Sequence, residues 1–291
     1  MGFGLKLLLV LAAAAILFAP APASAAPRII VVAAENFYGD VAQQIGGPEV
    51  KVTSILKNPD QDPHLFEASP SVARAVSAAR LVVYNGIGYD PWMKRLLGAA
   101  RGSNRKAIAV ADLVGAKPGD NPHIWYDPKT MPAFAKAFAT ALEKADPAHR
   151  ALYEARLARF EQSMKPIEAR VAALRARLSG TPVTATEPVF GAMFEALGMR
   201  VENRGFQLAM MNNTEPGASE VAAFETDLRM HRVRMLVYNS QVSGPVARRM
   251  VRLAEASHIP VVGVTETEPP GENYQGWMVR ELDAVDRALA T

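Results

Sequence analysis

Short β-branched runs alternate with alanine-rich amphipathic segments along most of the chain, and this alternation restricts the fold more than any other feature of the sequence. In the first half, we predict strands in "RIIVVAAEN", "VKVTSILK", "LVVYNG" and "AIAVAD". We predict helices in "FYGDVAQQIGG", "PSVARAVSAA", "PWMKRLLGAA" and residues 130–145, two of them beginning at a proline, which suits a first helical turn. Strands that alternate with helices build parallel sheets. The pattern therefore predicts an α/β lobe over residues 26–145.

The alternation is interrupted by a long amphipathic segment. From Tyr153 to Leu178, apolar residues recur every three or four positions, which predicts one helix closed by Gly180. About 30 residues at ~1.5 Å each span about 45 Å, more than one lobe needs. Pro166 lies inside this helix and predicts a kink. We interpret residues 146–180 as a linking helix between two lobes, although a helix packed along the surface of one domain would show the same spacing.

After Gly180 the alternation resumes and predicts a second α/β lobe over residues 181–291. Its predicted strands are "TPVTAT", "VRMLVYNS" and "IPVVGVTE". Its predicted helices cover residues 188–197, 215–232, 244–257 and 274–290. The expected fold class is therefore α/β, with two lobes of mainly parallel sheets joined by one long helix and a cleft between the lobes.

The first 25 residues are typical of a cleavable secretory signal. They contain one cation, Lys6, then an apolar run through Leu17 and the small-residue triplet Ala-Ser-Ala at 23–25. A transmembrane anchor is the alternative, but the run is short for one and is followed by prolines. Because the sequence has no cysteine, we expect neither disulfides nor a lipid-anchored cysteine. We predict export to the periplasm, with cleavage near Ala25.

The charge balance gives no support for a nucleic-acid partner. Lysine and arginine total 32 against 29 aspartates and glutamates, a formal net charge of +3. The length of 291 residues is enough for two lobes to bury cores of their own. We expect a monomer.

Two of the five histidines share one local setting. His64 lies in "DPHLFE" and His123 in "NPHIWYDP", each in a loop that follows strands of the first lobe. In open α/β sheets, ligand sites gather at the carboxyl ends of strands. Proline stiffens each loop and the following apolar and aromatic side chains pack beneath the imidazole, as a metal ligand requires. A single histidine would more simply be a capping or buried hydrogen-bonding residue, but the duplication favours metal ligands. We interpret His149, His231 and His258 as solvent-facing or capping residues.

Two carboxylates occupy matching positions in the second lobe. Glu187 follows the predicted strand "TPVTAT", and Glu266 ends "IPVVGVTE", so both are expected to face the cleft between the lobes. Each has a simpler explanation. Glu187 adds negative charge at a helix N-terminus, and Glu266 is an exposed loop acid, with Glu268 as a nearby alternative.

The sequence resembles the solute-binding proteins of metal ABC transporters, the zinc and manganese group with a rigid helix between its domains. The resemblance covers essentially the whole chain after the signal. It rests on "DPHLFEASPS", "LVVYNGIGYDPWMKRLL", "NPHIWYDP", "TEPVFGAMFEALGM" and "NTEPGASEV". Carried over position by position, it implies four metal ligands, His64, His123, Glu187 and Glu266, and a membrane permease as partner.

Two departures from the family pattern affect the choice of metal. The third ligand is histidine in many zinc members and glutamate in manganese members, so Glu187 favours manganese, and the histidine-rich loop of many zinc members is absent. The last ligand is usually aspartate, and Glu266 is one methylene longer. Two imidazoles and two carboxylates suit Mn²⁺ or Fe²⁺ and also hold Zn²⁺, for which general affinity is higher than for Mn²⁺. We expect one divalent transition metal, with manganese slightly ahead of zinc and the denticity of both glutamates open.

The expected function is capture of a metal ion between the lobes and its delivery to an ABC permease, without catalysis. A secreted metallohydrolase is the alternative class, but catalytic metal sites keep an open position for water, and the sequence has neither an HExxH helix nor a G-x-S-x-G elbow. A metal-binding adhesion protein on the same scaffold is a second alternative that the ligand residues do not separate.

Overall fold

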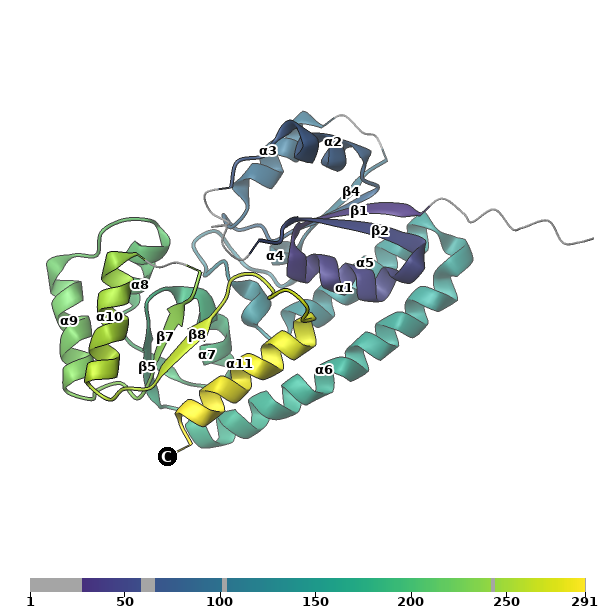
Figure 1. Cartoon of the computed structure of the whole chain (residues 1–291). Coiled ribbons are helices and arrows are strands. Elements are labelled where there is room, and N and C mark those ends of the chain that lie inside the picture. The colour runs from purple at the N-terminus through teal and green to yellow at the C-terminus, as the bar shows by residue number, and fades with distance from the viewer. Residues whose placement is uncertain (1–27, 59–65, 101–103, 242–243, 291) are drawn as a thin grey trace, which may run out of the picture.

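The computed structural model describes residues 28–58, 66–100, 104–241 and 244–290 (Figure 1). Its strands form two four-stranded sheets in which the recorded strand pairs are parallel, and one long helix joins the two halves of the chain. The predicted fold class is confirmed. The predicted signal segment and His64 lie outside the described residues.

The first lobe is built on a sheet with the strand order β2-β1-β3-β4. Its strands are β1 (Ile29–Glu35), β2 (Val50–Leu56), β3 (Leu81–Tyr84) and β4 (Lys106–Ala109). Its helices are α1 (Asn36–Gly46), α2 (Pro70–Ala78), α3 (Pro91–Ala99), α4 (Val110–Leu113) and α5 (Thr130–Ala145), with a short 3-10 turn at Ile124–Tyr126. Side chains of β1 and β3 pack alternately on α2 and α3 on one face and on α1 and α5 on the other.

The last predicted strand of the first lobe is a helix in its second half. The run "AIAVAD" was predicted to be a strand throughout, but β4 ends at Ala109 and Val110–Leu113 forms α4. Tyr84 and Ala109 are the last paired residues of β3 and β4. The amide of Ala111 then donates to the carbonyl of Asn85 at 2.9 Å, so the chain leaves the sheet at this point.

The second lobe is built on a sheet with the strand order β6-β5-β7-β8. Its strands are β5 (Pro182–Ala185), β6 (Arg200–Val201), β7 (Leu236–Asn239) and β8 (Val261–Val264). Its helices are α7 (Gly191–Ala196), α8 (Arg204–Met211), α9 (Ala218–Arg229), α10 (Pro245–Ala256) and α11 (Tyr274–Ala288), with a 3-10 turn at Pro188–Phe190. Sequence patterns missed β6, which has two residues, and α8, which follows Asn203 in the left-handed region without a side-chain cap.

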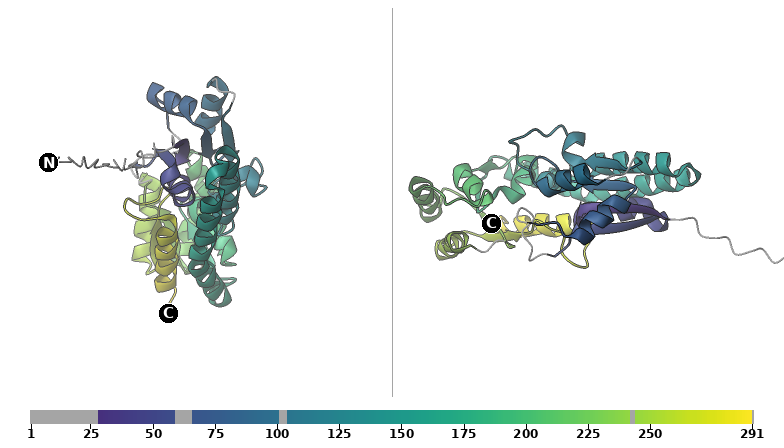
Figure 2. Two further views of the ribbon diagram at one scale, coloured as in Figure 1. Left: turned by 90° about the vertical axis from the view of Figure 1, so that its right-hand side faces the viewer. Right: turned by 90° about the horizontal axis from the view of Figure 1, so that it is seen from above.

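The predicted linking helix is α6 (Arg150–Leu178), which has 29 residues and extends along both lobes (Figure 2). At ~1.5 Å per residue it is about 43 Å long. Pro166 lies within the helix, which continues through it. The helix packs against α1 and α5 of the first lobe and against α11 of the second. Ion pairs attach it to both lobes: Arg156 pairs with Glu49 of the first lobe at 2.6 Å, and Arg170 pairs with Asp283 of the second.

The two lobes share one hydrophobic core. A single cluster of buried side chains includes residues of both sheets, of α6 and of α11, and we call it the shared core. At its centre, the ring of Tyr126 lies 5.0 Å from Phe190 and 5.6 Å from Trp277 between ring centroids. Asn36 also exchanges two hydrogen bonds with the backbone of Glu268, at 2.6 and 3.1 Å. The lobes are therefore fixed to one another by packing as well as by α6.

None of the helices in the described ranges combines the length and the hydrophobicity required to cross a bilayer.

Candidate metal centre

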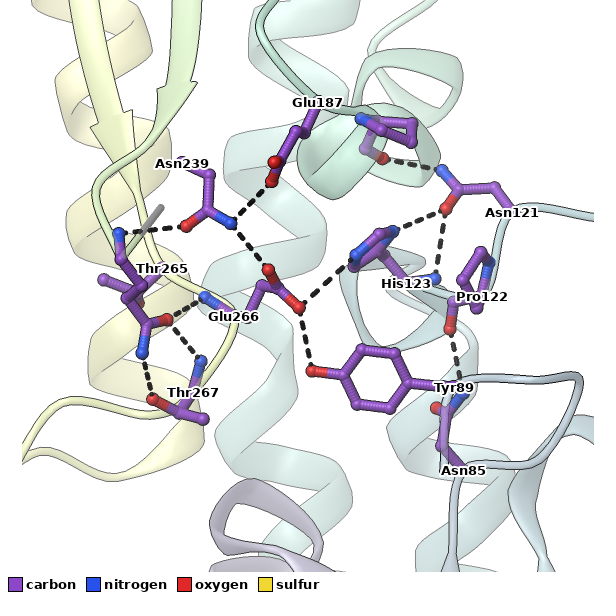
Figure 3. A network of polar contacts seen from close by, with 12 residues as sticks. Asn85, Tyr89, Asn121, Pro122, His123, Glu187, Asn239, Thr265, Glu266 and Thr267 are labelled. Atoms are coloured by element: carbon purple, nitrogen blue, oxygen red, sulfur yellow. Dashed lines mark hydrogen bonds and ion pairs between the residues drawn. The ribbon is translucent and has the colours of Figure 1, made fainter. Parts of the chain in front are cut away.

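A buried polar network lies where the carboxyl ends of the two sheets meet (Figure 3). The first lobe contributes the turn after β3, with Asn85 and Tyr89, and the loop that carries His123. The second lobe contributes Glu187 after β5, Asn239 at the end of β7 and Glu266 after β8. This is the edge at which ligands bind in open α/β sheets, so the fold brings polar residues from five separate segments to the place where a site is expected.

His123 is held in one orientation and one tautomer. It is 1 % exposed, and its Nδ1 lies 2.7 Å from Asn121 Oδ1. Asn121 donates through Nδ2 to the carbonyl of Pro188 at 2.7 Å, so its Oδ1 is the acceptor and Nδ1 of His123 carries the proton. Nε2 is therefore the nitrogen with a lone pair, and it lies 3.6 Å from Glu266 Oε2. As expected, the following aromatic residue supports the imidazole, since Trp125 packs edge-on at 5.2 Å.

The loop of His123 is fixed in turn by the segment after β3. Asn85 donates to the carbonyl of Pro122 at 2.9 Å and accepts a hydrogen bond from Tyr38 at 2.7 Å. The carboxylate of Asp90 accepts from the amides of Asn85 and Gly86 at 2.7 and 2.8 Å, which closes the turn. Burial raises the pKa of Asp90 to about 6. Ile87 in this turn has a φ of 42°, a left-handed conformation that a β-branched residue rarely adopts.

Glu266 is 2 % exposed and uses both carboxylate oxygens in hydrogen bonds. Oε2 accepts from the Tyr89 hydroxyl at 3.0 Å, and Oε1 accepts from Asn239 Nδ2 at 2.6 Å. Burial, followed by the charge of Glu266, raises the pKa of Tyr89, so this hydroxyl remains a donor. The backbone is fixed as well, because Gln241 Oε1 accepts from the amides of Glu266 and Thr267.

Glu187 joins the network through Asn239. It lies in an extended conformation directly before the 3-10 turn at Pro188, is 7 % exposed, and accepts from Asn239 Nδ2 through Oε2 at 2.7 Å. Within the described residues, no three histidines, aspartates or glutamates lie close enough together to hold a metal by themselves. The structure thus brings His123 and Glu266 into contact range and ties Glu187 to them through an amide, while His64 falls in a range that is not described.

Glu268, the alternative to Glu266, lies apart from this network. Its backbone bonds Asn36, and its side chain is 7 % exposed at the edge between the lobes. Burial, followed by the charges of Asp40 and Glu272, raises the pKa of Glu268 to about 9. A carboxyl group with this pKa is protonated at neutral pH and is a poor metal ligand. The position of Glu268 outside the network therefore favours Glu266 as the candidate ligand.

Behind the site, Glu281 of α11 connects the loops that carry His123 and Glu266. The Tyr126 hydroxyl lies 2.7 Å from Glu281 Oε2 and 2.7 Å from the carbonyl of Thr265, and Trp277 donates to Glu281 Oε1 at 2.7 Å. Burial raises the pKa of Glu281 to about 7, against the opposing effect of the hydrogen bonds from Tyr126 and Trp277. One hydroxyl hydrogen cannot serve two acceptors at full strength. The network is satisfied when protonated Glu281 donates to Tyr126 and Tyr126 donates to Thr265.

The three remaining histidines occupy the structural positions expected for them. His149 lies directly before α6, with Nδ1 2.6 Å from Asp146 Oδ2. His231 and His258 follow the ends of α9 and α10 with φ values of 51° and 55°, the left-handed conformation of a residue that terminates a helix.

Sequence reasoning missed three residues that hold the candidate ligands: Tyr89, Asn121 and Asn239. Asn121 directly precedes Pro122 in the motif of His123, and an asparagine two residues before a histidine is a signal for a local side-chain hydrogen bond. Asn239 is the last residue of β7, and Glu187 and Glu266 follow β5 and β8 by two residues each. Its importance depends on β7 lying between β5 and β8, an order that local patterns do not give.

Fold and site together define a two-lobed α/β binding protein with a buried nitrogen and oxygen donor set between its lobes. The chain belongs to the ZnuA family, described as zinc-uptake complex component A, periplasmic, which matches residues 31–288. A relative, the manganese ABC transporter substrate-binding lipoprotein PsaA of Streptococcus mitis, is 24 % identical over 293 residues, covering 92 % of this chain and 91 % of PsaA.

Solved structures support the same fold. The periplasmic zinc binding protein TroA from Treponema pallidum superimposes with a TM-score of 0.77 at 20 % identity, covering 91 % of this chain and 100 % of TroA. A mutant structure of the laminin-binding adhesin Lmb from Streptococcus agalactiae gives a TM-score of 0.74 at 18 % identity, covering 90 % of this chain and 99 % of Lmb. The family and the relative PsaA are transporter components rather than enzymes.

Proposed function

We propose that this protein binds a divalent transition metal in the periplasm and delivers it to an ABC permease, with His64, His123, Glu187 and Glu266 as the ligands. The observation that carries the proposal is the orientation of His123. Its Nδ1–H is committed to Asn121, which leaves Nε2 directed at Glu266 Oε2 at 3.6 Å in a buried site between the lobes. A neutral imidazole with a fixed tautomer beside a buried carboxylate is the arrangement that metal ligation requires.

The residue types support two metals. Two imidazoles and two carboxylates neutralise a dication and supply enough hard oxygen for Mn²⁺, which is the slight preference that the sequence indicates. The general affinity order favours Zn²⁺ at the same donors. The relative PsaA is named for manganese and the structural neighbour TroA for zinc. Similarity to these proteins therefore supports either Mn²⁺ or Zn²⁺ as the metal that is carried.

Delivery to a permease is supported by kinship with substrate-binding components of ABC transporters. The shared core supports a mechanism with little movement between the lobes, so binding orders the ligand loops rather than closing a wide cleft. PsaA is named a lipoprotein, whereas the present sequence has no cysteine to carry a lipid. We therefore propose a periplasmic protein without a cysteine-linked anchor, which performs no chemistry on its cargo.

The test is the metal content of the His123→Ala variant after expression in the native compartment. We expect it to lose most of its Zn²⁺ and Mn²⁺ affinity while keeping the circular dichroism spectrum of the wild type. His231→Asn is the matched control, because asparagine tolerates the left-handed conformation at the end of α9. If His123→Ala retained the metal content of the control, the ligand assignment would be wrong.

A further inference from the structure

Asn121 belongs to the first lobe, but its side chain is also held by the second. We propose that Asn121 is a positioning residue that couples the second lobe to the imidazole of His123, so that the second lobe controls how firmly His123 holds the metal. This inference rests on the proposed function and deepens it, because it names a contact through which a movement between the lobes reaches a candidate ligand.

The side-chain amide of Asn121 bridges the two lobes (Figure 3). Its Nδ2 donates to the carbonyl of Pro188 at 2.7 Å, 67 positions along the chain. Its Oδ1 accepts from Nδ1 and from the backbone amide of His123, at 2.7 and 3.1 Å. Pro188 directly follows Glu187 and begins the 3-10 turn that leads into α7. One planar amide therefore links a candidate ligand of the first lobe to the segment that carries a candidate ligand of the second.

The position of this amide depends on Gly191, the first residue of α7. A Cβ atom at residue 191 would lie 2.6 Å from Asn121 Nδ2, closer than a side chain can approach without moving the amide. The backbone of Gly191 is right-handed helical, with a φ of −57°, so its conformation does not require glycine. Alanine is the better helix former at such a position. What glycine provides here is room for the side chain of Asn121.

A small displacement is enough to break this link. A hydrogen bond of 2.7 Å is lost when its donor and acceptor separate beyond about 3.5 Å, so a shift of about 1 Å between the lobes removes it. The shared core permits movements of this size without a wide opening of the cleft. Once Asn121 is released from Pro188, its amide can rotate, and Nδ1–H of His123 loses its fixed acceptor. The imidazole then loses its fixed orientation and tautomer, and the metal leaves faster.

The test uses Gly191→Ala, which keeps every polar group of the site and displaces the amide of Asn121. Gly98→Ala is the matched control, because Gly98 is an exposed residue of α3 where an added Cβ meets no neighbouring group within 4 Å among the described residues. Dissociation of Zn²⁺ is followed by stopped-flow transfer to an excess of a chromogenic chelator. We expect the rate to rise about tenfold in Gly191→Ala, the effect of losing one hydrogen bond, and to stay at the wild-type value in the control.

A double-mutant cycle shows whether the effect passes through Asn121. Gly191→Ala should have no further effect on the rate in the Asn121→Ala background, where the amide is absent. An unchanged rate in Gly191→Ala, or an equal effect in both backgrounds, would overturn the inference.

If Gly191→Ala does not fold, Asn121→Ala is compared with Asn36→Ala, which removes two other hydrogen bonds between the lobes. Faster dissociation in Asn121→Ala than in Asn36→Ala supports the inference, and equal rates overturn it.

The outcomes separate this inference from the proposed function. Failure of wild type to bind Zn²⁺ would refute the proposed function, and the positioning of His123 would then be tested in the metal-free protein. There, ¹⁵N NMR of the imidazole reports which ring nitrogen carries the proton. We expect the proton on Nδ1 in wild type and Gly98→Ala, and a mixture of both tautomers in Gly191→Ala. Identical ring signals of His123 in Gly191→Ala and Gly98→Ala would overturn the inference.

Discussion

Replacing Glu281 by glutamine removes a buried proton-binding group while keeping its hydrogen bonds. Glutamine has the same length, and its NH₂ group can donate to Tyr126 as the protonated carboxyl does. Its carbonyl oxygen can accept from Trp277, which donates to Glu281 at 2.7 Å in the wild type. Glu281→Gln therefore represents the protonated state of the wild type at every pH.

The magnitude follows from the pKa of Glu281, which burial raises from 4.5 to about 7. Between these values the folded protein binds more protons than the unfolded chain, so the free energy of unfolding falls as the pH rises. The contribution is fully present below pH 4.5 and is lost as the pH rises through about 7. From about pH 5 to about pH 8, Glu281 should cost the wild type about 2.5 kcal/mol of stability relative to the variant.

The assay is urea unfolding of metal-free wild type and Glu281→Gln at both pH values. Asp90 and Glu268 also have raised pKa values, but both proteins contain them, so the difference between the proteins isolates Glu281. We expect the two unfolding free energies to be similar near pH 5 and the variant to be more stable near pH 8. A difference that stays constant over this range would show that Glu281 is ionised in the folded protein at both pH values and that the assigned proton is absent.

Three further results are expected. Tyr89→Phe removes one hydrogen bond to Glu266 and should weaken Zn²⁺ binding about threefold to tenfold by isothermal titration calorimetry; an unchanged affinity would show that this bond does not position the carboxylate. Dialysis at about pH 5 should release metal that is retained at about pH 7.5, because ligation needs neutral imidazole, and equal retention would exclude imidazole ligands. Met164→Ala, in the fully buried face of α6, should lower the free energy of unfolding by about 2–4 kcal/mol in urea, whereas a loss below about 0.5 kcal/mol would indicate that this face is not tightly packed.

Most of the fold could be predicted from local patterns because its elements are long or strongly periodic. The spacing of apolar residues from Tyr153 to Leu178 predicted α6, whose buried residues follow that spacing. Patterns failed where tertiary contacts decide the structure. β6 is a strand because it pairs with β5, and β4 ends early because Ala111 bonds Asn85. Neither contact has a local sequence signal.

The candidate site could be predicted only in part. Residues at the ends of predicted strands gave Glu187 and Glu266, and the repeated setting gave His64 and His123. The residues that orient them come from the spatial order of strands and from contacts between lobes, such as the 3.0 Å bond from Tyr89 to Glu266 over a separation of 177 residues. The sequence also gave no reason to expect that one amide would touch both glutamates, since this depends on β7 lying between two other strands.

The shared core has a consequence for any attempt to divide the molecule. Cutting the chain within α6 would uncover Tyr126 on one fragment and Phe190 and Trp277 on the other, along with the apolar stripes of the severed helix. Each fragment would then expose a broad apolar surface to water. It would aggregate, or it would need the other fragment in order to fold. Neither lobe is therefore an independent domain, because each depends on the other to cover its part of the shared core.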